Sequence, residues 1–427
     1  MESNIDLTIN NIGVQGTALF GVGITDTLPL GMSEMAGTTT EGHENYGNYR
    51  SVDGSIMCWI PMFYYRWGAS DSPRSTKYGL NSLDVKSKYD FTDVAAANAA
   101  GYALHRAFYD NGEIKDGFFV DKYQASNNSG IASSIKNSVP ISAHPDNNPF
   151  SVLSGSISNT SAGAIDAIKT RGSKFFVTTI FIQRALSLLS MAHGQATNNV
   201  TDCAWYDVTG ATNYPKGNNS ESLSDVNDAT VKYSIAAYQK VGRTGSGLPF
   251  AKTAHNGQKN GVVDLNGNLS EICLGLTQLS GKYYALKTSV AASSLTSGSN
   301  SISDAWGEVG ITAKYDSLGL VIGALNAPSD IVSSAIGSLN NPVFSNAVNG
   351  VNWAASCAGI PLAGGNSQTG TDLFGHDKLI VRYVNNMCPI IGGDYNDGIN
   401  AGMWALNTIQ PNTASFDSVG VRAALYI

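Results

Sequence analysis

From Asn198 onward, the chain shows no helical hydrophobic period. Short β-prone segments such as residues 282–286 and 379–384 alternate there with long stretches of serine, glycine and asparagine, for instance residues 289–303 and 325–341. Loops of this length in a compact domain usually carry function or wrap around neighbours. The 46 glycines and 13 prolines have no collagen-like period. The pattern therefore predicts a loop-rich globular protein.

Helical signals are confined to the part of the chain before Asn198. Residues 161–171 have helical spacing and stop at Gly172, and residues 95–100 form a shorter helical segment. A further helix is expected to start after Thr178 as its N-cap. Its apolar face repeats at helical spacing and consists of Ile182, Ala185, Leu186 and Leu189.

Residues 55–67 form an apolar and strongly aromatic segment, Ser-Ile-Met-Cys-Trp-Ile-Pro-Met-Phe-Tyr-Tyr-Arg-Trp. A run with this composition favours buried strands over a surface loop. We therefore expect one or two buried strands in this segment. They would belong to a smaller, mostly β N-terminal region that covers residues 1–110.

Charge and motif content exclude several classes of function. The 26 basic and 33 acidic residues give a net charge of −7, so the basic footprint that nucleic acid requires is missing. Gly21 and Gly23 are not followed by the third glycine of a dinucleotide fingerprint, and no Gly-Lys-Ser/Thr follows a glycine-rich stretch. The six histidines form no metal-binding motif. Nucleic acid, nucleotide cofactors and transition metals are therefore not expected partners.

Cysteine spacing and hydropathy give two further expectations. The cysteines are far apart and form no C-x-x-C pair, so we expect reduced, buried thiols. Residues 1–20 lack the basic and apolar regions of a signal peptide. The apolar stretch at 175–192 is interrupted by Gln183 and Arg184. Neither a signal peptide nor membrane insertion is expected.

Two polar stretches near the C-terminal end stand out. In residues 261–271, an apolar strand runs into Asn266-Gly267-Asn268 and then reaches Glu271. Asn-Gly favours a tight turn with positive φ, and Asn268 and Glu271 can tie the loop through hydrogen bonds. In the second stretch, residues 392–427, an Asn-rich segment leads to Arg422 and an apolar run that is expected to lie in a sheet. We expect a buried carboxylate or carbonyl groups to hold Arg422.

Five short motifs follow one another in a fixed order. They are Gly117-Phe118-Phe119-Val120-Asp121-Lys122-Tyr123, Val177-Thr178, residues 261–271, Gly392-Gly393-Asp394-Tyr395 and Gly420-Val421-Arg422. This order resembles the formylglycine-generating-enzyme (sulfatase-modifying factor) branch of the C-type lectin fold. The resemblance implies an α+β domain over residues 111–427, with two helices on a small, twisted antiparallel sheet surrounded by long loops.

Departures from that branch bear on activity. The enzymes of the branch use two cysteines shortly after the Gly-Gly motif, and those positions hold Asp397 and Gly402 in this chain. Cys388 and Cys357 lie outside the register of the motif. Without a thiolate at these positions, the oxidase chemistry is not expected. We therefore expect a protein that is not an enzyme.

Non-enzymatic members of the same fold fit the pattern better. The tail-tip tropism determinants of bacteriophages and other variable proteins of diversity-generating retroelements resemble this chain in a Gly-Gly motif, a loop-rich stretch and a Gly-x-Arg motif. In them, the stretch between the motifs binds the ligand. The residues of this chain that the resemblance assigns to ligand binding are Tyr395, Asn396, Asp397, Ile399, Asn400, Asn407, Thr408, Gln410 and Phe416. We expect these to face solvent over buried supports, namely Trp404, Val419, Arg422 and Leu425.

The resemblance also implies a location and partners. It predicts a virion protein of a tail fibre, tail tip or head fibre, made in the host cytoplasm, that binds a glycan or protein receptor on the host surface. Residues 1–110 would anchor it to other virion proteins, and the assembly would be a homotrimer.

Several alternatives stay open from the sequence. A capsid decoration protein without receptor binding would have the same layout, and a formylglycine-type enzyme remains a third possibility. Asp and Glu residues could also pair across the chain as in a glycosidase. Calcium could bind Asp264, Asn266, Asn268 and Glu271, although an Asn-Gly turn needs no ion.

Overall fold

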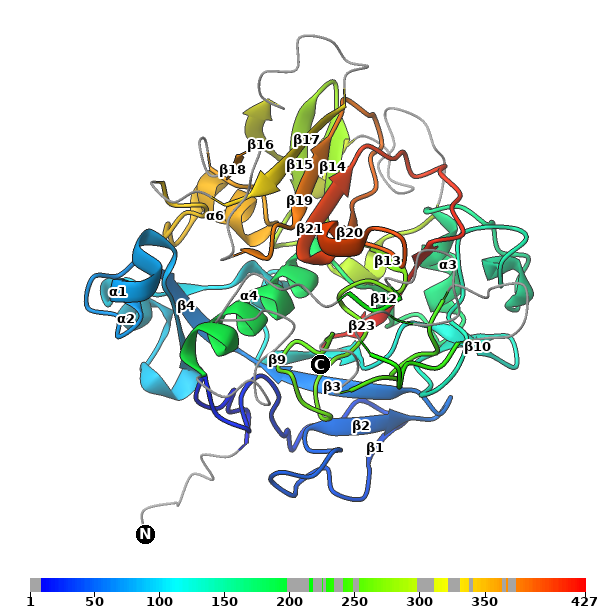
Figure 1. Ribbon diagram of the computed structural model, residues 1–427, viewed down its shortest axis with the longest axis horizontal. Coiled ribbons are helices and arrows are strands. Elements are labelled where there is room, and N and C mark those ends of the chain that lie inside the picture. The colour runs from blue at the N-terminus through cyan, green and yellow to red at the C-terminus, as the bar shows by residue number, and fades with distance from the viewer. Residues whose placement is uncertain are drawn as a thin grey trace.

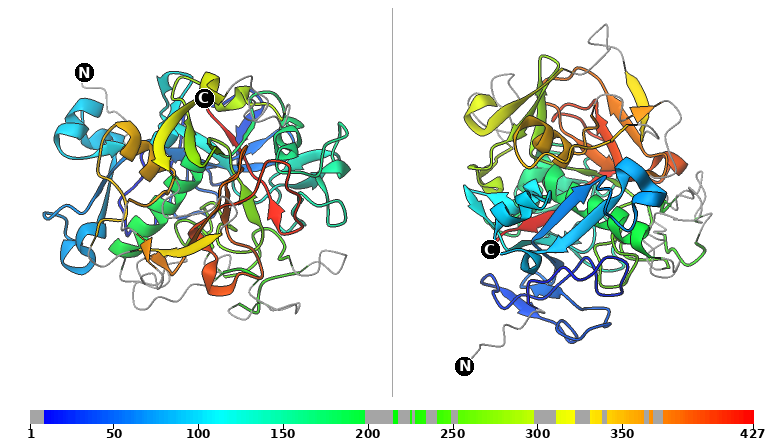
Figure 2. Two further views of the ribbon diagram at one scale, coloured as in Figure 1. Left: turned by 90° about the horizontal axis from the view of Figure 1, so that it is seen from above. Right: turned by 90° about the vertical axis from the view of Figure 1, so that its left-hand side faces the viewer.

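The computed structural model in Figure 1 places two large β-sheets on either side of one long helix. Smaller sheets and short helices surround them, and Figure 2 shows the same arrangement from two other directions. The structure describes residues 9–197, 215–217, 225, 228–233, 241–248, 253–297, 311–321, 331–337, 341–362, 366–367 and 374–427.

The first large sheet is antiparallel and has six strands in the described residues. In spatial order they are β1 (Met32–Glu34), β2 (Asn48–Ser51), β3 (Ile56–Pro61), β9 (Gly117–Asp121), β23 (Ala423–Leu425) and β12 (Phe176–Val177). The aromatic segment at 55–67 forms two strands, β3 in this sheet and β4 (Phe63–Trp67) in a smaller one. Both strands are largely buried, which confirms the prediction for this segment.

Strands from both sides of residue 110 share the six-stranded sheet. Strand β3 pairs with β9 from Met57 opposite Asp121 to Pro61 opposite Gly117. The main hydrophobic cluster contains side chains from Ile12 to Ala424. Residue 110 therefore does not separate two independently packed units in the described part of the chain, although the region before it is rich in strands as expected.

The second large sheet is mixed, whereas the sequence predicts a small antiparallel sheet. Among the described residues it has seven strands, in the order β18 (Asn366–Ser367), β17 (Val332–Ile336), β19 (Lys378–Val381), β21 (Gly402–Thr408), β20 (Ile390–Gly392), β13 (Ser270–Ile272) and β22 (Val419–Gly420). Two of its pairings are parallel, β19 with β21 and β13 with β22. Strand β17 lies in the stretch 325–341 that the sequence assigns to a loop. Its pairing with strands on both sides overrides the weak strand signal of a serine-rich segment.

The smaller sheets flank these two. They consist of β5 (Leu83–Ser87), β4 and β6 (Ala103–Leu104), of β14 (Leu276–Leu279), β15 (Lys282–Leu286) and β16 (Tyr315–Val321), of β7 (Tyr109–Asp110) and β8 (Glu113–Ile114), and of β10 (Ser126–Asn128) and β11 (Ile131–Ser133). The helices are α1 (Ser75–Tyr78), α2 (Val94–Ala99), α3 (Gly163–Lys169), α4 (Ile180–Ala196), α5 (Ile311–Lys314) and α6 (Gly350–Cys357). The described residues thus combine many strands with few helices, consistent with an α+β class.

Three of the described helices before Asn198, α2, α3 and α4, lie where the sequence predicts them, with one shift, whereas the short helix α1 was not predicted. Helices α2 and α3 confirm the expected segments. The N-cap of α4 is Thr179 rather than Thr178, because the Thr179 side chain accepts a hydrogen bond from the Ile182 amide. Helix α6 lies in the region where no helical period is visible, since eight residues are too few to reveal one.

Helix α4 runs between the two large sheets (Figure 1). Every side chain from Ile180 to Gln195 is buried. Because the helix has protein on all sides, its two interrupting polar residues also face protein groups: the Arg184 guanidinium donates to the carbonyl oxygens of Met403 and Ala405 in β21, at 2.6 and 3.2 Å. Burial lowers the pKa of Arg184 to about 10.

Arg422 is fully buried and joins the two large sheets. Its guanidinium forms a two-pronged ion pair with Glu271 of β13, with Nε–Oε2 and Nη2–Oε1 distances of 2.8 and 2.5 Å. It also donates to the carbonyl oxygens of Asp121 and Val263, both at 2.9 Å. Burial by itself would lower the pKa of Arg422, but the charge of Glu271 raises it above its usual value. The predicted carboxylate and carbonyl partners of Arg422 are both confirmed.

Two glutamines complete the environment of Glu271. Gln124 and Gln183 each donate a side-chain hydrogen bond to its carboxylate, at 3.2 and 3.0 Å. Gln124 also accepts from the Asn268 side chain at 2.8 Å. The network therefore connects α4, both sheets and the Asn-Gly-Asn turn.

The turn at residues 266–268 has the predicted backbone. Gly267 and Asn268 have φ angles of 77° and 63°. A Cβ atom on Gly267 would overlap the backbone oxygen of Lys216. Position 267 therefore requires glycine for its φ angle and for the close approach of another segment.

We predict that Arg422→Met lowers the free energy of unfolding by about 3–5 kcal/mol, because it leaves the Glu271 charge buried without its partner. Chemical denaturation measures this change. Arg50→Met, at an exposed arginine, is the matched control and should change the unfolding free energy by less than about 0.5 kcal/mol. Equal effects of the two substitutions would contradict the assigned role.

We predict that Gly267→Val destabilises the protein more than Gly112→Val does. Both glycines have φ near 78°, so both variants pay for a β-branched residue at positive φ. Only position 267 adds an overlap with backbone, since nothing lies within 4 Å of a Cβ on Gly112. The difference should be about 1–3 kcal/mol in thermal or chemical unfolding. Equal melting temperatures would show that the Lys216 segment does not press on the turn.

Candidate functional site

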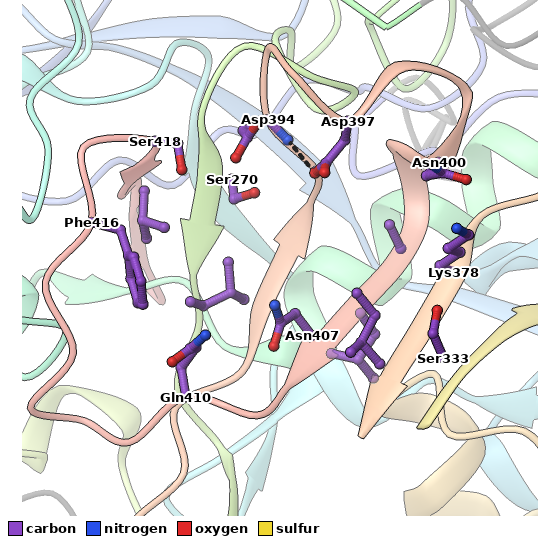
Figure 3. A pocket seen from close by; sticks show the side chains of 16 residues that line it. Ser270, Ser333, Lys378, Asp394, Asp397, Asn400, Asn407, Gln410, Phe416 and Ser418 are labelled. Atoms are coloured by element: carbon purple, nitrogen blue, oxygen red, sulfur yellow. Dashed lines mark hydrogen bonds between the residues drawn. The ribbon is translucent and has the colours of Figure 1, made fainter. Parts of the chain in front are cut away.

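A cleft of about 330 Å³ lies on the outer face of the seven-stranded sheet (Figure 3). Its floor comes from β13, β17, β19, β20, β21 and β22, and two loops at residues 393–400 and 410–418 form its rim. The opposite face of the same sheet packs against α4. The residues that line the cleft are Ser270, Ser333, Lys378, Ile380, Ile390, Gly393, Asp394, Asp397, Asn400, Ala405, Leu406, Asn407, Gln410, Phe416, Ser418 and Val419.

Strand register explains why these distant residues meet. Ser333 pairs with Ile380, Ile380 with Asn407, and Asn407 with Ile390. The four residues form one row across β17, β19, β21 and β20. Since partners in neighbouring strands face the same side of a sheet, the four side chains lie on one face. Along this row, polar and apolar side chains alternate.

Many polar side chains of the cleft make no side-chain hydrogen bond within the described part of the chain. Lys378, Asn400 and Gln410 have no side-chain partner there, nor do the hydroxyls of Ser270 and Ser333. The Asn407 Oδ1 atom accepts from the Ile409 amide at 3.0 Å. These groups point into or along the cleft in Figure 3. Donors and acceptors are therefore available to a ligand.

Two carboxylates lie at one end of the cleft. The Asp394 amide donates to Asp397 Oδ2 at 2.9 Å, and the Asn396 amide donates to Asp394 Oδ1 at 2.8 Å. Burial and the neighbouring charge of Asp397 raise the pKa of Asp394 to about 6, against the opposing bonds from Asn396 and Ser418. The Asp394 carboxyl thus changes between donor and acceptor near neutral pH.

Five of the nine predicted ligand residues line this cleft: Asp397, Asn400, Asn407, Gln410 and Phe416. Asn396 is exposed beside the cleft without lining it. The side chain of Ile399 lies outside the described residues. The four predicted supports, Trp404, Val419, Arg422 and Leu425, are all buried.

Two of the predicted solvent-facing residues are buried instead. Tyr395 packs on Val241 and Leu269 and supports the Asn-Gly-Asn turn, with its amide donating to the Asn268 carbonyl. Thr408 is fully buried, and its hydroxyl bonds to the Tyr283 hydroxyl at 2.8 Å. Asn407 and Thr408 are consecutive in β21, so their side chains must point to opposite faces. The expectation that both face solvent was therefore wrong.

Sequence reasoning missed the part of the cleft that other strands contribute. Lys378 and Ile380 lie at alternating positions of β19, so period-two spacing could have placed them on one face. Ser333 lies in a segment expected to be a loop. Asp394 and Ser418 lie in the stretch between the Gly-Gly and Gly-x-Arg motifs, so their position in the sequence could have added them to the predicted ligand residues.

The positions that hold cysteines in the formylglycine-generating enzymes differ chemically in this chain. Asp397 is part of the cleft rim, and Gly402 begins β21. A Cβ atom on Gly402 would overlap the Asp377 carboxylate, so a cysteine at position 402 would require Asp377 to move. Cys388 is buried, which raises the pKa of its thiol, and no cysteine is among the described residues that line the cleft.

The two carboxylates named for calcium, Asp264 and Glu271, are each paired with a protein cation. Asp264 pairs with Lys216 at 2.7 Å and Glu271 with Arg422. No group of three or more His, Cys, Asp or Glu side chains suited to a metal ion occurs in the described ranges. No helix in the described part of the chain has both the length and the apolar character needed to span a membrane.

No protein-family model matches the sequence, and no curated protein matches it. A solved structure titled "Major Tropism Determinant U1 Variant" is 12% identical, with a TM-score of 0.30, over 88% of this chain and 64% of that chain. This chain therefore spans less than two-thirds of that protein's length. A TM-score this low does not establish a shared fold, so the lectin fold remains a prediction.

We predict that Asp397→Asn lowers the pKa of Asp394 by about half a unit to one unit, because it removes a neighbouring like charge. Carboxyl carbon chemical shifts measured across pH 3–8 report the pKa directly. Asp417→Asn is the control, since the charge of Asp417 raises the pKa of Asp394 less than the charge of Asp397 does. An Asp394 pKa that is the same in both variants would show that burial alone sets it.

Proposed function

We propose that this chain is a phage virion protein that binds a receptor on the host surface through the cleft on the seven-stranded sheet. The proposal joins the motif resemblance with one structural observation. Polar side chains that have no side-chain partner among the described residues gather in a concave site, and the stretch between the Gly-Gly and Gly-x-Arg motifs contributes both of its rim loops and strand β21. The resemblance assigns ligand binding to this same stretch.

The character of the cleft favours recognition over purely structural packing. Side-chain amides, hydroxyls and one lysine on an open face lose no internal bonds when a ligand binds them. Rigid strands hold the floor, so little ordering is required on binding. A decoration protein without a ligand has no need for such a set of free polar groups, so we propose capsid decoration only as the second candidate.

We propose further that the chain does not catalyse formylglycine formation. That chemistry needs a pair of accessible thiols, and the corresponding positions hold Asp397 and Gly402. The overlap that a side chain at position 402 would make with the Asp377 carboxylate supports this part of the proposal.

Residues 1–110 would then attach the protein to the phage particle. We propose that they contact other virion proteins and that the assembled protein is a homotrimer. In this arrangement the cleft points away from the particle. Cross-linking of the purified chain, with mass measurement in solution, tests the trimer.

We predict that Asn407→Ala and Gln410→Ala each reduce attachment of the labelled protein to susceptible bacteria by about tenfold, the effect of one lost hydrogen bond near the upper end of its usual range. Flow cytometry over a panel of strains measures attachment. Asn396→Ala, an exposed asparagine outside the cleft, is the matched control and should keep attachment unchanged. The proposal fails if all three variants attach like the parent chain, or if the parent binds no strain.

A further inference from the structure

The partnerless groups of the cleft are mostly donors, or groups that both donate and accept. Lys378 offers three protons, and the Asn407 Nδ2 group offers two. Asn400 and Gln410 each present a donor and an acceptor side by side. Adjacent hydroxyl groups of a ligand also donate and accept side by side, so they match these amides.

Apolar surface is interleaved with these groups. In the row across the sheet, Ile380 and Ile390 flank Asn407. The ring of Phe416 stands at the opposite rim from Lys378 in Figure 3 and is half-buried against the core. A ligand that fits this floor needs an apolar face next to a hydroxylated edge, which is the arrangement in a sugar ring.

The size of the cleft favours a small ligand over a folded protein. A volume of about 330 Å³ lies at the lower end of the range for small-molecule sites. Protein partners usually cover about 800 Å² of surface, most of it flatter than this concavity. The cleft therefore suits the terminal units of a chain better than a folded protein surface.

The charges in the cleft further limit the class of ligand that it can bind. The cleft contains one lysine, Lys378, and two carboxylates, Asp394 and Asp397, so the site has no excess of positive charge for a polyanion. Lys378 and the amide nitrogens donate protons, and the amide oxygens and the two carboxylates accept them, while these two carboxylates are not part of any group of three or more metal-binding side chains in the described residues. The side chains that the cleft offers therefore act on hydroxyls directly.

We propose that the ligand of this cleft is a polyhydroxylated saccharide, held by Asn400, Asn407, Gln410 and Lys378 and stacked on Phe416, with no bridging metal ion. This rests on the proposed function and names its ligand class. It identifies the sugar units at the exposed end of a surface polysaccharide as the recognised group.

The test uses the full-length protein and bacteria that it binds. Cells are treated with mild periodate, which cleaves vicinal diols, or with a broad-specificity protease, and binding is also measured in EDTA. We expect periodate to reduce attachment at least tenfold, and protease and EDTA to leave it within twofold. Extracted surface polysaccharide should compete with the cells, and Phe416→Leu should weaken this competition several-fold while the melting temperature stays close to that of the parent chain.

The outcomes separate the two proposals. Attachment that depends on Asn407 but resists periodate and is lost after protease treatment would overturn the saccharide inference and leave receptor binding in place. Attachment lost in EDTA would overturn the direct, metal-free mode. If neither Asn407→Ala nor Gln410→Ala reduces attachment, the cleft is not the binding site, and both proposals fail.

Discussion

The ion pair between Arg422 and Glu271 is the interaction on which both large sheets depend. Glu271 belongs to β13 of the seven-stranded sheet, while Arg422 directly precedes β23 of the six-stranded sheet. A buried charge pair is costly unless further hydrogen bonds satisfy it, and carbonyl groups and two glutamines do so. Strand β13 is thereby held from its inner side, and the neighbouring Ser270 lines the cleft.

The seven-stranded sheet performs different tasks on its two faces. On the inner face, Trp404 stacks on Phe344, and Arg184 bonds to the carbonyl groups of β21. On the outer face, Asn407 and its row neighbours Ser333 and Ile380 are at least partly exposed. Alternation along a single strand is enough to separate the buried side chains from those on the cleft side, since each residue of β21 has a fixed side.

Local signals in the sequence predicted a good part of this arrangement. The helical periods, the aromatic strands and the Asn-Gly-Asn turn depend on short-range spacing and burial, which a single sequence reveals. For Arg422 the kind of partner was predictable, because a buried charge needs a carboxylate or carbonyl groups, although the partners themselves are remote in the chain. The cleft was only half predictable. Its rim comes from one continuous stretch, whereas Ser333 and Lys378 reach the floor through strand pairing, and register between distant strands leaves no local mark. The burial of Thr408 shows the same limit, because a loop was assumed where a strand runs.

The position of β23 has a consequence for how the protein is made. This strand lies between β9 and β12, and Arg422 contacts Asp121, 301 residues earlier in the chain. A ribosome must therefore synthesise all the intervening segments before the six-stranded sheet can close. Until then the edge of β9 stays unpaired, and folding dominated by such remote contacts is slow. During synthesis the nascent chain is thus exposed to aggregation and to chaperones for longer than a protein built from local contacts.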